Sequence, residues 1–397
     1  NRQQGGNYWE SFNHAIGDAT EPGSTFKLAS VMALLEDGYI SVEDSVNINH
    51  GRAFFGNHEI KDSEWHSETN VTIRRAFEMS SNVGIARIVD KMYSRSNKGQ
   101  EYIDRLVQFG LRDKTGIEIE GEGMPHIKDA YDPKWSNVMS LPWMAHGYEL
   151  EITPLQTLAF YNAVANNGKK MRPFLVKNVL DGGRVVKTFD PEVQISRIAS
   201  AATIREARGL LEGVVTRGTG SKLSSRDFTF AGKTGTTKLE YWKEGGGKYQ
   251  SSFVGYFPAE EPKYSCIVLI NNPRKNGYYG GVVAGPVFRE IAEKCMATDE
   301  QLMANASVPL DDEEQSLPSY EVGYASDMIE VLKHLNIDFT NEVEGSWSIT
   351  LPGDGQVAVK DRTIESHLVP NVVGMGLRDA VFILENRGMT VKINGHG

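Results

Sequence analysis

Cysteine, long apolar runs and clusters of positive charge are all scarce in this sequence. Its 397 residues include two cysteines, Cys266 and Cys295, which predicts buried free thiols rather than a disulfide framework. The longest apolar runs, such as 266–270, fall far short of the roughly 20 residues that cross a bilayer. The net charge of −10 excludes nucleic acid as a partner, because phosphate binding depends on clustered Lys and Arg side chains.

Metal-ligand spacing and a targeting segment are also missing. The nine histidines form no ligand pattern: His58-Glu59 leads into no second His, and His146 is interpreted as structural. We therefore expect neither a metal nor another cofactor. The polar, Gly-rich opening at 1–11 contains no signal peptide.

Length and periodicity predict more than one folded unit. The chain is 40% apolar and 24% charged over 397 residues, which is more than one ordinary globular core holds. Helices are predicted over 24–36, 73–79, 83–92, 101–109, 154–166, 204–215 and 286–296, with Ser24 capping the first. Strands are predicted over 228–236, 251–257 and 264–271. Strands flanked by helices indicate an α+β domain with an antiparallel sheet.

The composition shifts near residue 300. The predicted organisation is a large domain at 1–300, an acidic linker at 301–316, and two small modules at 317–367 and 368–397. Each module shows an apolar-Pro opening, a Gly, an Asp-led helix and an apolar strand, which indicates a tandem arrangement.

The first chemical motif runs from Ser24 to Lys27, at the predicted start of a helix. A hydroxyl becomes a nucleophile when a base takes its proton, and a spacing of three places Lys27 one helical turn from Ser24. The backbone N–H of Ser24 also suits an oxyanion. The alternative is a capping serine beside a solvated lysine. Lys27 is a base only when neutral. Burial and a neighbouring like charge are the two causes that would lower its pKa, so the hypothesis requires a second cation nearby.

A motif inside a predicted strand, Lys233-Thr234-Gly235-Thr236, supplies that cation. Gly235 would let a substrate backbone approach, and the Thr234 and Thr236 hydroxyls would hold a substrate carboxylate. The backbone N–H of Thr236 is the natural second oxyanion donor. Another Lys-Thr-Gly at 114–116 follows a helix exit and is interpreted as structural. A phosphate-binding P-loop is excluded, because position 227 is not Gly and no helix follows.

The remaining motif is Ser80-Ser81-Asn82, in a turn between two predicted helices. Ser80 would relay a proton between Lys27 and a leaving amine, and the Asn82 amide would hold a substrate carbonyl. Taken singly, Ser80 and Asn82 are ordinary turn residues. Their weight comes from the set of three motifs.

The order Ser-x-x-Lys, Ser-x-Asn, Lys-Thr-Gly is the signature of penicillin-recognising serine enzymes. The sequence resembles the class B, division-type penicillin-binding proteins over roughly 10 to 300. The segments carrying this resemblance are 21–27, 80–84, 147–156 and 253–258. The resemblance implies a penicillin-binding or serine β-lactamase-like transpeptidase fold, with an antiparallel sheet flanked by helices and a helical subdomain.

The resemblance also implies roles and partners. Ser24 would be acylated, Lys27 would be the base, Ser80 and Asn82 the relay and substrate contact, and 233–236 the carboxylate-binding strand. The implied activity is a D,D-transpeptidase that cross-links peptidoglycan stem peptides ending in D-Ala-D-Ala in septal cell-wall synthesis. β-Lactams would be inhibitors, and other cell-division and wall-synthesis proteins would be partners. The expected location is the periplasmic or extracytoplasmic face of the plasma membrane, through an anchoring helix upstream of this chain.

Two further features follow from the resemblance. Residues 368–374 with 377–386 resemble a PASTA repeat that lacks its final strand, and 317–346 resemble a degenerate one. In the family, two sheet strands precede the nucleophile segment, but residues 1–20 are not predicted as strands. We therefore expect this chain to be a fragment.

Several alternatives stay open. D,D-carboxypeptidase or endopeptidase activity would use the same acyl-enzyme with a different acceptor. A class A β-lactamase would need a glutamate motif that is not recognisable here. Outside enzymes, the chain would be an inert penicillin-binding scaffold.

Overall fold

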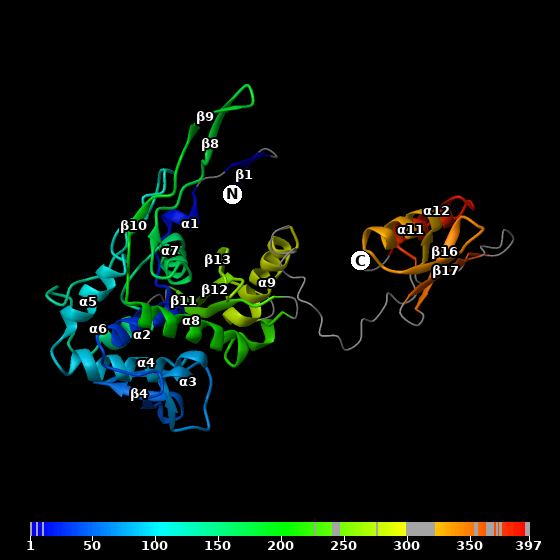
Figure 1. The fold of residues 1–397 in the computed structure, drawn as a ribbon. Coiled ribbons are helices and arrows are strands. Elements are labelled where there is room, and N and C mark those ends of the chain that lie inside the picture. Colours follow the sequence, from blue (N-terminus) through cyan, green and yellow to red (C-terminus); the bar gives the residue numbers. More distant parts are fainter. Residues whose placement is uncertain are drawn as a thin grey trace. The chain divides into compact units, whose positions relative to one another are not determined.

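The computed structural model describes residues 2–393 apart from 5–6, 10–11, 226–227, 240–246, 275–276, 299–321, 353–355, 363–368, 371 and 373–374 (Figure 1). The chain divides into two compact units, Asn1–Asp299 and Glu300–Gly397, and each is described by itself. The linker expected at 301–316 lies outside the described residues. Among the described helices, none is long and apolar enough to cross a bilayer.

A three-stranded antiparallel sheet lies at the centre of the first unit. In spatial order its strands are β11 (Ala231–Leu239), β12 (Lys248–Phe257) and β13 (Tyr264–Asn271). Alternate side chains point to opposite faces of a strand. Accordingly, Phe253 and Phe257 pack with Phe288 in one apolar cluster, whereas Val254 and Tyr256 join the main core.

Helices cover both faces of this sheet (Figure 1). The face of Phe253 is covered by α9 (Gly280–Thr298), and the opposite face is covered by α7 (Pro154–Ala165) and α8 (Ala201–Thr216). Helix α2 (Lys27–Glu36) packs against α8 and is buried from Lys27 to Leu34. A short 3-10 turn, η1 (Gly23–Phe26), leads into α2 and contacts β11.

Shorter elements form a helical subdomain beside α2. They are α3 (Ile73–Glu78), α4 (Asn82–Val89), the π-helical turn η3 (Asp90–Ser94), α5 (Gly99–Gln108) and α6 (Ser140–Met144). Small antiparallel pairs accompany them: β3 (Ser45–Asn47) with β6 (Asn70–Thr72), and β4 (Arg52–Phe55) with β5 (His58–Lys61). Two 3-10 turns complete the unit, η2 (Asn49–Gly51) and η4 (Ser221–Leu223).

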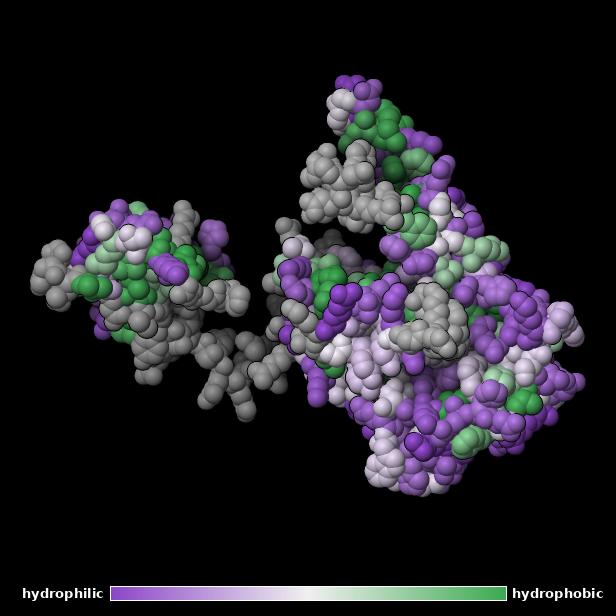
Figure 2. Space-filling model, turned by 180° about the vertical axis from the view of Figure 1, so that it is seen from behind, coloured by the Kyte–Doolittle hydropathy of each residue, from purple (hydrophilic) through white to green (hydrophobic). Residues whose placement is uncertain are grey.

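A hairpin arm projects from this unit between α7 and α8 in the sequence (Figure 1). It consists of β8 (Asn178–Asp181) and β9 (Arg184–Thr188), and β7 (Lys170–Met171) pairs with β10 (Val193–Ile195) at its base. Several exposed apolar side chains lie on it, including Val179, Leu180 and Val186, and Figure 2 shows this apolar surface. The sequence analysis did not predict the arm, although the Gly-Gly turn at 182–183 is a hairpin signal.

The predicted helices and strands are present with shifted ends, and three expectations need correction. Ser24 does not cap the helix: η1 precedes α2, and the Ser24 hydroxyl contacts Lys27 instead. Residues 1–20 include two short strands, β1 (Arg2–Gln4) and β2 (Asn7–Trp9), which pair with each other and not with the central sheet, and a helical turn, α1 (His14–Gly17). Helix α9 begins before Pro286, because Ala284 packs in the core beside Phe288.

The second unit contains a four-stranded sheet in the order β14-β16-β17-β15. Its elements are β14 (Val322–Tyr324), α11 (Ala325–His334), β15 (Phe339–Glu342), β16 (Trp347–Pro352) and β17 (Val357–Asp361). Leu332 packs on Val357 and Val359 to form its small core. Helix α12 (Leu377–Glu385) follows a single parallel bridge between Val322 and Met375.

Candidate active site

Two glycines position the segment that carries Ser24. Gly23 has a φ of +58°, and a Cβ there would lie 2.1 Å from Thr237 Oγ1 on β11. The Gly23 N–H donates to the Gly147 carbonyl at 3.0 Å, and a Cβ on Gly147 would lie 2.1 Å from the Gly23 oxygen. Since neither position has room for a side chain, η1 packs directly against both β11 and the turn at 147.

Lys27 is buried beneath Ser24 at the start of α2. Its Nζ donates to Ser24 Oγ at 3.0 Å, to Ser80 Oγ at 3.0 Å and to the Ser80 carbonyl at 2.5 Å. Burial lowers the pKa of Lys27 to about 7, although the nearby Asp62 carboxylate raises it. A substantial fraction of Lys27 is therefore neutral near pH 7 and able to accept a proton.

Ser80 occupies the tight turn between α3 and α4. Its φ of +60° is uncommon for a residue with a side chain. The turn is held by the Ser80 N–H, which donates to Phe77 O at 3.0 Å, and by the Ser81 N–H, which donates to Ala76 O at 2.8 Å. These bonds keep the backbone in the conformation that places Ser80 Oγ within reach of Lys27.

Lys233 reaches the same hydroxyl from β11. Its Nζ donates to Ser80 Oγ at 2.8 Å and to the Thr234 carbonyl at 3.0 Å, and the side chain is fully buried. Burial, and then the charge of Lys27, lower the pKa of Lys233 well below its usual value. The second amine that the sequence hypothesis required is therefore present, but burial, and not a neighbouring positive charge, lowers the pKa of Lys27.

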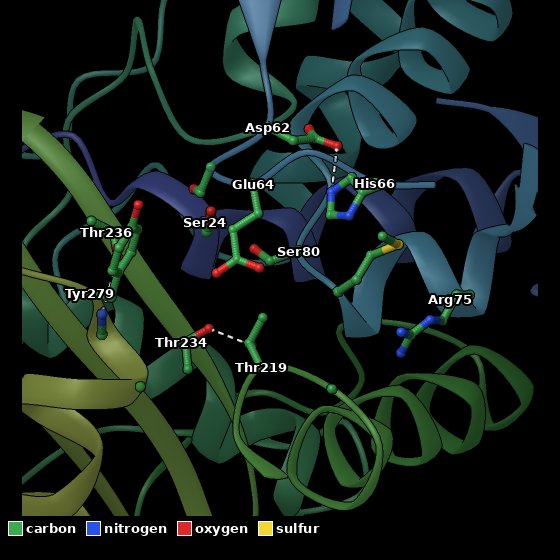
Figure 3. Close-up of a pocket in the computed structure, with 15 residues that line it drawn as sticks. Ser24, Asp62, Glu64, His66, Arg75, Ser80, Thr219, Thr234, Thr236 and Tyr279 are labelled. Carbon is green, nitrogen blue, oxygen red and sulfur yellow. Dashed lines mark hydrogen bonds and ion pairs between the residues drawn. The ribbon is translucent and has the colours of Figure 1, made fainter. Parts of the chain in front are cut away.

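A cavity of about 300 Å³ opens beside these groups (Figure 3). Ser24, Ser80, Thr234 and Thr236 all line it. Thr234 Oγ1 and Thr219 Oγ1 are 2.7 Å apart, and the Gly280 N–H at the start of α9 donates to Thr236 Oγ1 at 3.0 Å. Hydroxyl groups therefore form the β11 side of the cavity.

The structure gives Gly235 a packing role. A Cβ at this position would lie 2.2 Å from Ser252 Oγ and 2.9 Å from Thr25 Cγ2. Alternation along β11 places Gly235 on the opposite face from Thr234 and Thr236. The glycine thus allows β11 to approach η1, and its side of the strand does not face the cavity.

Asn82 lies apart from the other motif residues. It is the first residue of α4, and its amide Nδ2 donates to the Lys61 carbonyl on β5 at 2.7 Å. The described lining of the cavity does not include it. The structure therefore joins Ser24, Lys27, Ser80 and Lys233 in one hydrogen-bonded chain, with Asn82 bracing the wall beside it.

Comparison with known proteins identifies the family. Residues 1–293 match the family described as the penicillin binding protein transpeptidase domain. The chain belongs to this family. The α+β fold and the class predicted from the three motifs are thereby confirmed.

Several transpeptidases and penicillin-binding proteins are related in sequence. Peptidoglycan D,D-transpeptidase FtsI of Escherichia coli K12 is 31% identical over 70% of this chain and 44% of its own length. Penicillin-binding protein PbpB of Mycobacterium tuberculosis is 30% identical over 75% of this chain and 43% of its own. Stage V sporulation protein D of Bacillus subtilis is 26% identical over 97% of this chain and 51% of its own. The chain thus spans about half the length of these relatives.

Solved structures show the same fold. The transpeptidase domain of Burkholderia pseudomallei penicillin-binding protein 3 is 25% identical, with a TM-score of 0.61 over 72% of this chain and 81% of its own. Penicillin-binding protein 3 of Mycobacterium tuberculosis, complexed with aztreonam, is 28% identical, with a TM-score of 0.61 over 72% of this chain and 64% of its own.

In this transpeptidase-family chain, Asp62 holds the start of α4 beside Ser80, and no sequence motif pointed to this residue. Its carboxylate accepts hydrogen bonds from Ser81 Oγ at 2.7 Å and from the Val83 N–H at 2.9 Å. His66 Nε2 lies 3.3 Å from the same carboxylate. Ser81 Oγ also caps α4 by accepting from the Gly84 N–H at 2.9 Å. This network joins the loop after β5 to the start of α4, next to Ser80.

The structure also shows the surroundings of residues to which no sequence motif assigned a catalytic role. His146 is buried near Lys27, and burial and then the Lys27 charge lower its pKa to about 3, so it is neutral. In the other Lys-Thr-Gly, the N–H and Oγ1 of Thr115 both donate to the Glu122 carboxylate at 2.6 Å. That copy is held in a local contact with Glu122, as expected for a structural segment. Cys266 and Cys295 are free, half-buried thiols.

Proposed function

We propose that this chain is a serine D,D-transpeptidase that cross-links peptidoglycan stem peptides ending in D-Ala-D-Ala and is acylated by β-lactams. The main observation behind this proposal is a chain of hydrogen bonds that runs from Ser24 Oγ through Lys27 Nζ and Ser80 Oγ to Lys233 Nζ. That arrangement contains a nucleophile, a base with a lowered pKa and a path for a proton.

The acylation step begins with neutral Lys27. Lys27 Nζ takes the proton of Ser24, and Ser24 Oγ forms a bond with the carbonyl carbon of the penultimate D-Ala. Negative charge then develops on the former carbonyl oxygen. The backbone N–H groups of Ser24 and Thr236 are the proposed donors that stabilise it.

The tetrahedral intermediate collapses when the C–N bond to the terminal D-Ala breaks. The leaving nitrogen needs a proton, and the proposed path runs from Lys27 through Ser80 Oγ, which hydrogen-bonds both lysines. Free D-Ala departs and the acyl group stays on Ser24. An amine of a second stem peptide then attacks the ester carbon, and Lys27 accepts that amine's proton. The bond between Ser24 Oγ and the acyl carbon breaks as Lys27 returns the proton to Ser24 Oγ. In a β-lactam the broken C–N bond belongs to the ring, so the leaving group stays attached.

The cavity hydroxyls fit the terminal carboxylate of the donor. Thr234, Thr236 and Thr219 present oxygens on the β11 side of the cavity, and hydroxyls donate well to carboxylates. Asn82 is proposed to act with Ser80 in the substrate-facing turn. In this structure the Asn82 amide donates a hydrogen bond to the Lys61 carbonyl. To contact a substrate, the amide would have to break that hydrogen bond.

The wider setting is also proposed. The relation to peptidoglycan D,D-transpeptidase FtsI supports a place outside the plasma membrane, with an upstream anchor and partners from division and wall synthesis. The described part of the second unit combines a four-stranded sheet with two helices. This fits small PASTA-like modules at 317–367 and 368–397. Truncation after residue 299 should leave acylation intact, and loss of acylation would place those modules in the catalytic unit.

Intact-mass spectrometry with benzylpenicillin tests the acyl-enzyme. We expect a stable adduct that maps to Ser24 and is lost in Ser24→Ala. Incubation with a peptide ending in D-Ala-D-Ala, with and without an added D-amino acid, then separates transpeptidation from carboxypeptidase activity. Release of D-Ala without exchange would favour the carboxypeptidase alternative. A folded protein that forms no adduct would favour the inert scaffold.

A further inference from the structure

Glu64 places a carboxylate in the active-site cavity that the proposed chemistry does not use. It belongs to the loop between β5 and β6 and lines the cavity together with Ser24, Ser80 and Thr234. Figure 3 shows its side chain extending from that loop into the cavity. The proposed activation of Ser24 uses Lys27, whose Nζ contacts the Ser24 hydroxyl, and does not involve Glu64.

The loop that carries Glu64 is anchored on both sides. Two residues before it, Asp62 accepts from Ser81 Oγ and the Val83 N–H, and the Asp62 N–H donates to Gly51 O at 2.9 Å. Two residues after it, the His66 carbonyl lies 3.0 Å from His50 Nδ1. A side chain between two such anchors is presented at a defined place in the cavity wall.

The other charged groups of the cavity lining have partners. Asp62 is paired with His66 and hydrogen-bonded by Ser81, and Arg75 Nη1 donates to the Arg217 carbonyl at 3.0 Å. The side chain of Glu64 is exposed to the cavity. Within the described part of the chain, that carboxylate makes no hydrogen bond or ion pair.

An aromatic surface lies beside this carboxylate. Tyr279 lines the same cavity. Its hydrogen bond with Tyr278 and its burial raise the pKa of Tyr279 to about 12, and the Glu64 charge adds a smaller contribution. Tyr278 braces it, since the rings of Tyr278 and Tyr279 are 4.7 Å apart and Tyr278 stacks on Tyr249 at 3.9 Å. A carboxylate next to an aromatic face is a good environment for an ammonium group.

We propose that Glu64 and Tyr279 recognise a free ammonium group carried by the peptidyl donor, so that Glu64 selects donors with a positively charged side chain near the scissile bond. This inference rests on the proposed function and names a substrate class for the same site. The ammonium belongs to the donor rather than to the acceptor amine. A neighbouring carboxylate favours the protonated form of an amine, whereas an acceptor must be neutral to attack.

Three penicillins that differ at one side-chain carbon provide the test. Ampicillin carries an ammonium there, benzylpenicillin hydrogen and carbenicillin a carboxylate. Second-order acylation rates are measured at about pH 6.5, where an α-amino group is mostly protonated. Each rate is divided by that of benzylpenicillin for the same protein, which cancels any loss of folded enzyme. Glu68→Gln is the control, because Glu68 is an exposed carboxylate nearby in the same connection and is absent from the described cavity lining.

In Glu64→Gln we expect the ampicillin ratio to fall roughly three- to tenfold, as for a charge contact that is partly screened by solvent. The carbenicillin ratio should rise. Glu64→Lys should enlarge both changes, and Glu68→Gln should retain the wild-type ratios. Unchanged ratios in both Glu64 variants, or equal changes in the control, would overturn the proposal.

A second measurement distinguishes donor from acceptor. With an uncharged thioester donor and an added D-amino acid, the partition between aminolysis and hydrolysis should be the same in wild type and Glu64→Gln. A shifted partition with unshifted penicillin ratios would assign Glu64 to the acceptor and overturn the donor proposal. If none of the three penicillins acylates the wild-type protein, the proposed function itself fails. Acylation with unchanged ratios refutes only the role of Glu64.

Discussion

Lys27 and Lys233 converge on one oxygen atom, Ser80 Oγ, at 3.0 and 2.8 Å. Both side chains are fully buried, and a buried ammonium is costly unless its charge is balanced. Burial therefore lowers both pKa values, to about 7 for Lys27 and well below the usual range for Lys233. The Asp62 carboxylate opposes the shift of the Lys27 pKa.

Acylation should depend on pH through Lys27. The base must be neutral, so the second-order rate with benzylpenicillin should fall about tenfold per unit below the Lys27 pKa of about 7 and level off above it. Rapid-quench mass spectrometry between about pH 5 and pH 9 measures this profile. A rate that stays flat down to pH 5 would show that Lys27 is not the base. Lys27→Arg, which cannot deprotonate, should be inactive at every pH.

Lys27 should destabilise the fold at neutral pH. Its pKa falls from 10.5 to about 7 on folding, so between these values the unfolded chain binds more protons and stability rises with pH. The full shift corresponds to about 4 to 5 kcal/mol. Lys27→Met removes this cost but also three hydrogen bonds. We therefore expect its stability advantage over wild type to shrink by a few kcal/mol between pH 7 and pH 10.5, as measured by urea unfolding. An advantage independent of pH would contradict the burial argument.

Ser80 and Ser81 are neighbours with separable roles. Ser80→Ala removes the hydroxyl between the two lysines, so acylation should fall about 10²- to 10⁴-fold with little change in melting temperature. Ser81→Ala removes the buried bond to Asp62 and the cap of α4, which should cost about 1–3 kcal/mol of stability. Acylation rates and thermal melts of both variants check this division. Equal loss of activity and stability in both would mean that the turn has a structural role alone.

Gly147 should be needed for the position of Ser24. Ala at this position would adopt a φ of +86° and place its Cβ 2.1 Å from Gly23 O. We expect Gly147→Ala to lower acylation at least tenfold, since η1 must move. Gly38→Ala is the matched control: its φ is +68°, but nothing lies within 4 Å of the added Cβ. It should show only the left-handed cost of about 1–2 kcal/mol and keep the wild-type acylation rate. Similar acylation rates for the two variants would show that Gly147 is not needed to position Ser24.

Much of the local structure could be predicted from the sequence. Strands β12 and β13 and the cap of α3 at Thr72 follow from alternation and from start signals. Boundaries were less predictable where tertiary contacts compete with local preference. Ser24 was expected to cap a helix, but its hydroxyl contacts Lys27 and the chain forms a 3-10 turn first.

The site itself was predictable only in part. The three motifs named Ser24, Lys27, Ser80 and Lys233, and the fold brings these four together. No local pattern points to Asp62, Thr219 or Glu64, because their positions depend on a loop and a turn packing against distant elements. Gly235 was expected to let a substrate approach, whereas in the structure an added Cβ would collide with Ser252 and Thr25.

By itself, the sequence determined which reactive groups this protein has and in what order, because residue types at a spacing of three, in a turn and in a strand match the pattern of a proposed nucleophile, base and carboxylate site. The tertiary structure alone decided how those groups act on one another. A pKa of about 7 for Lys27 requires its burial, and a shared Ser80 hydroxyl requires helix α2, the turn after α3 and strand β11 to meet. Burial and convergence depend on contacts between residues far apart in the chain, and no short stretch of sequence contains them.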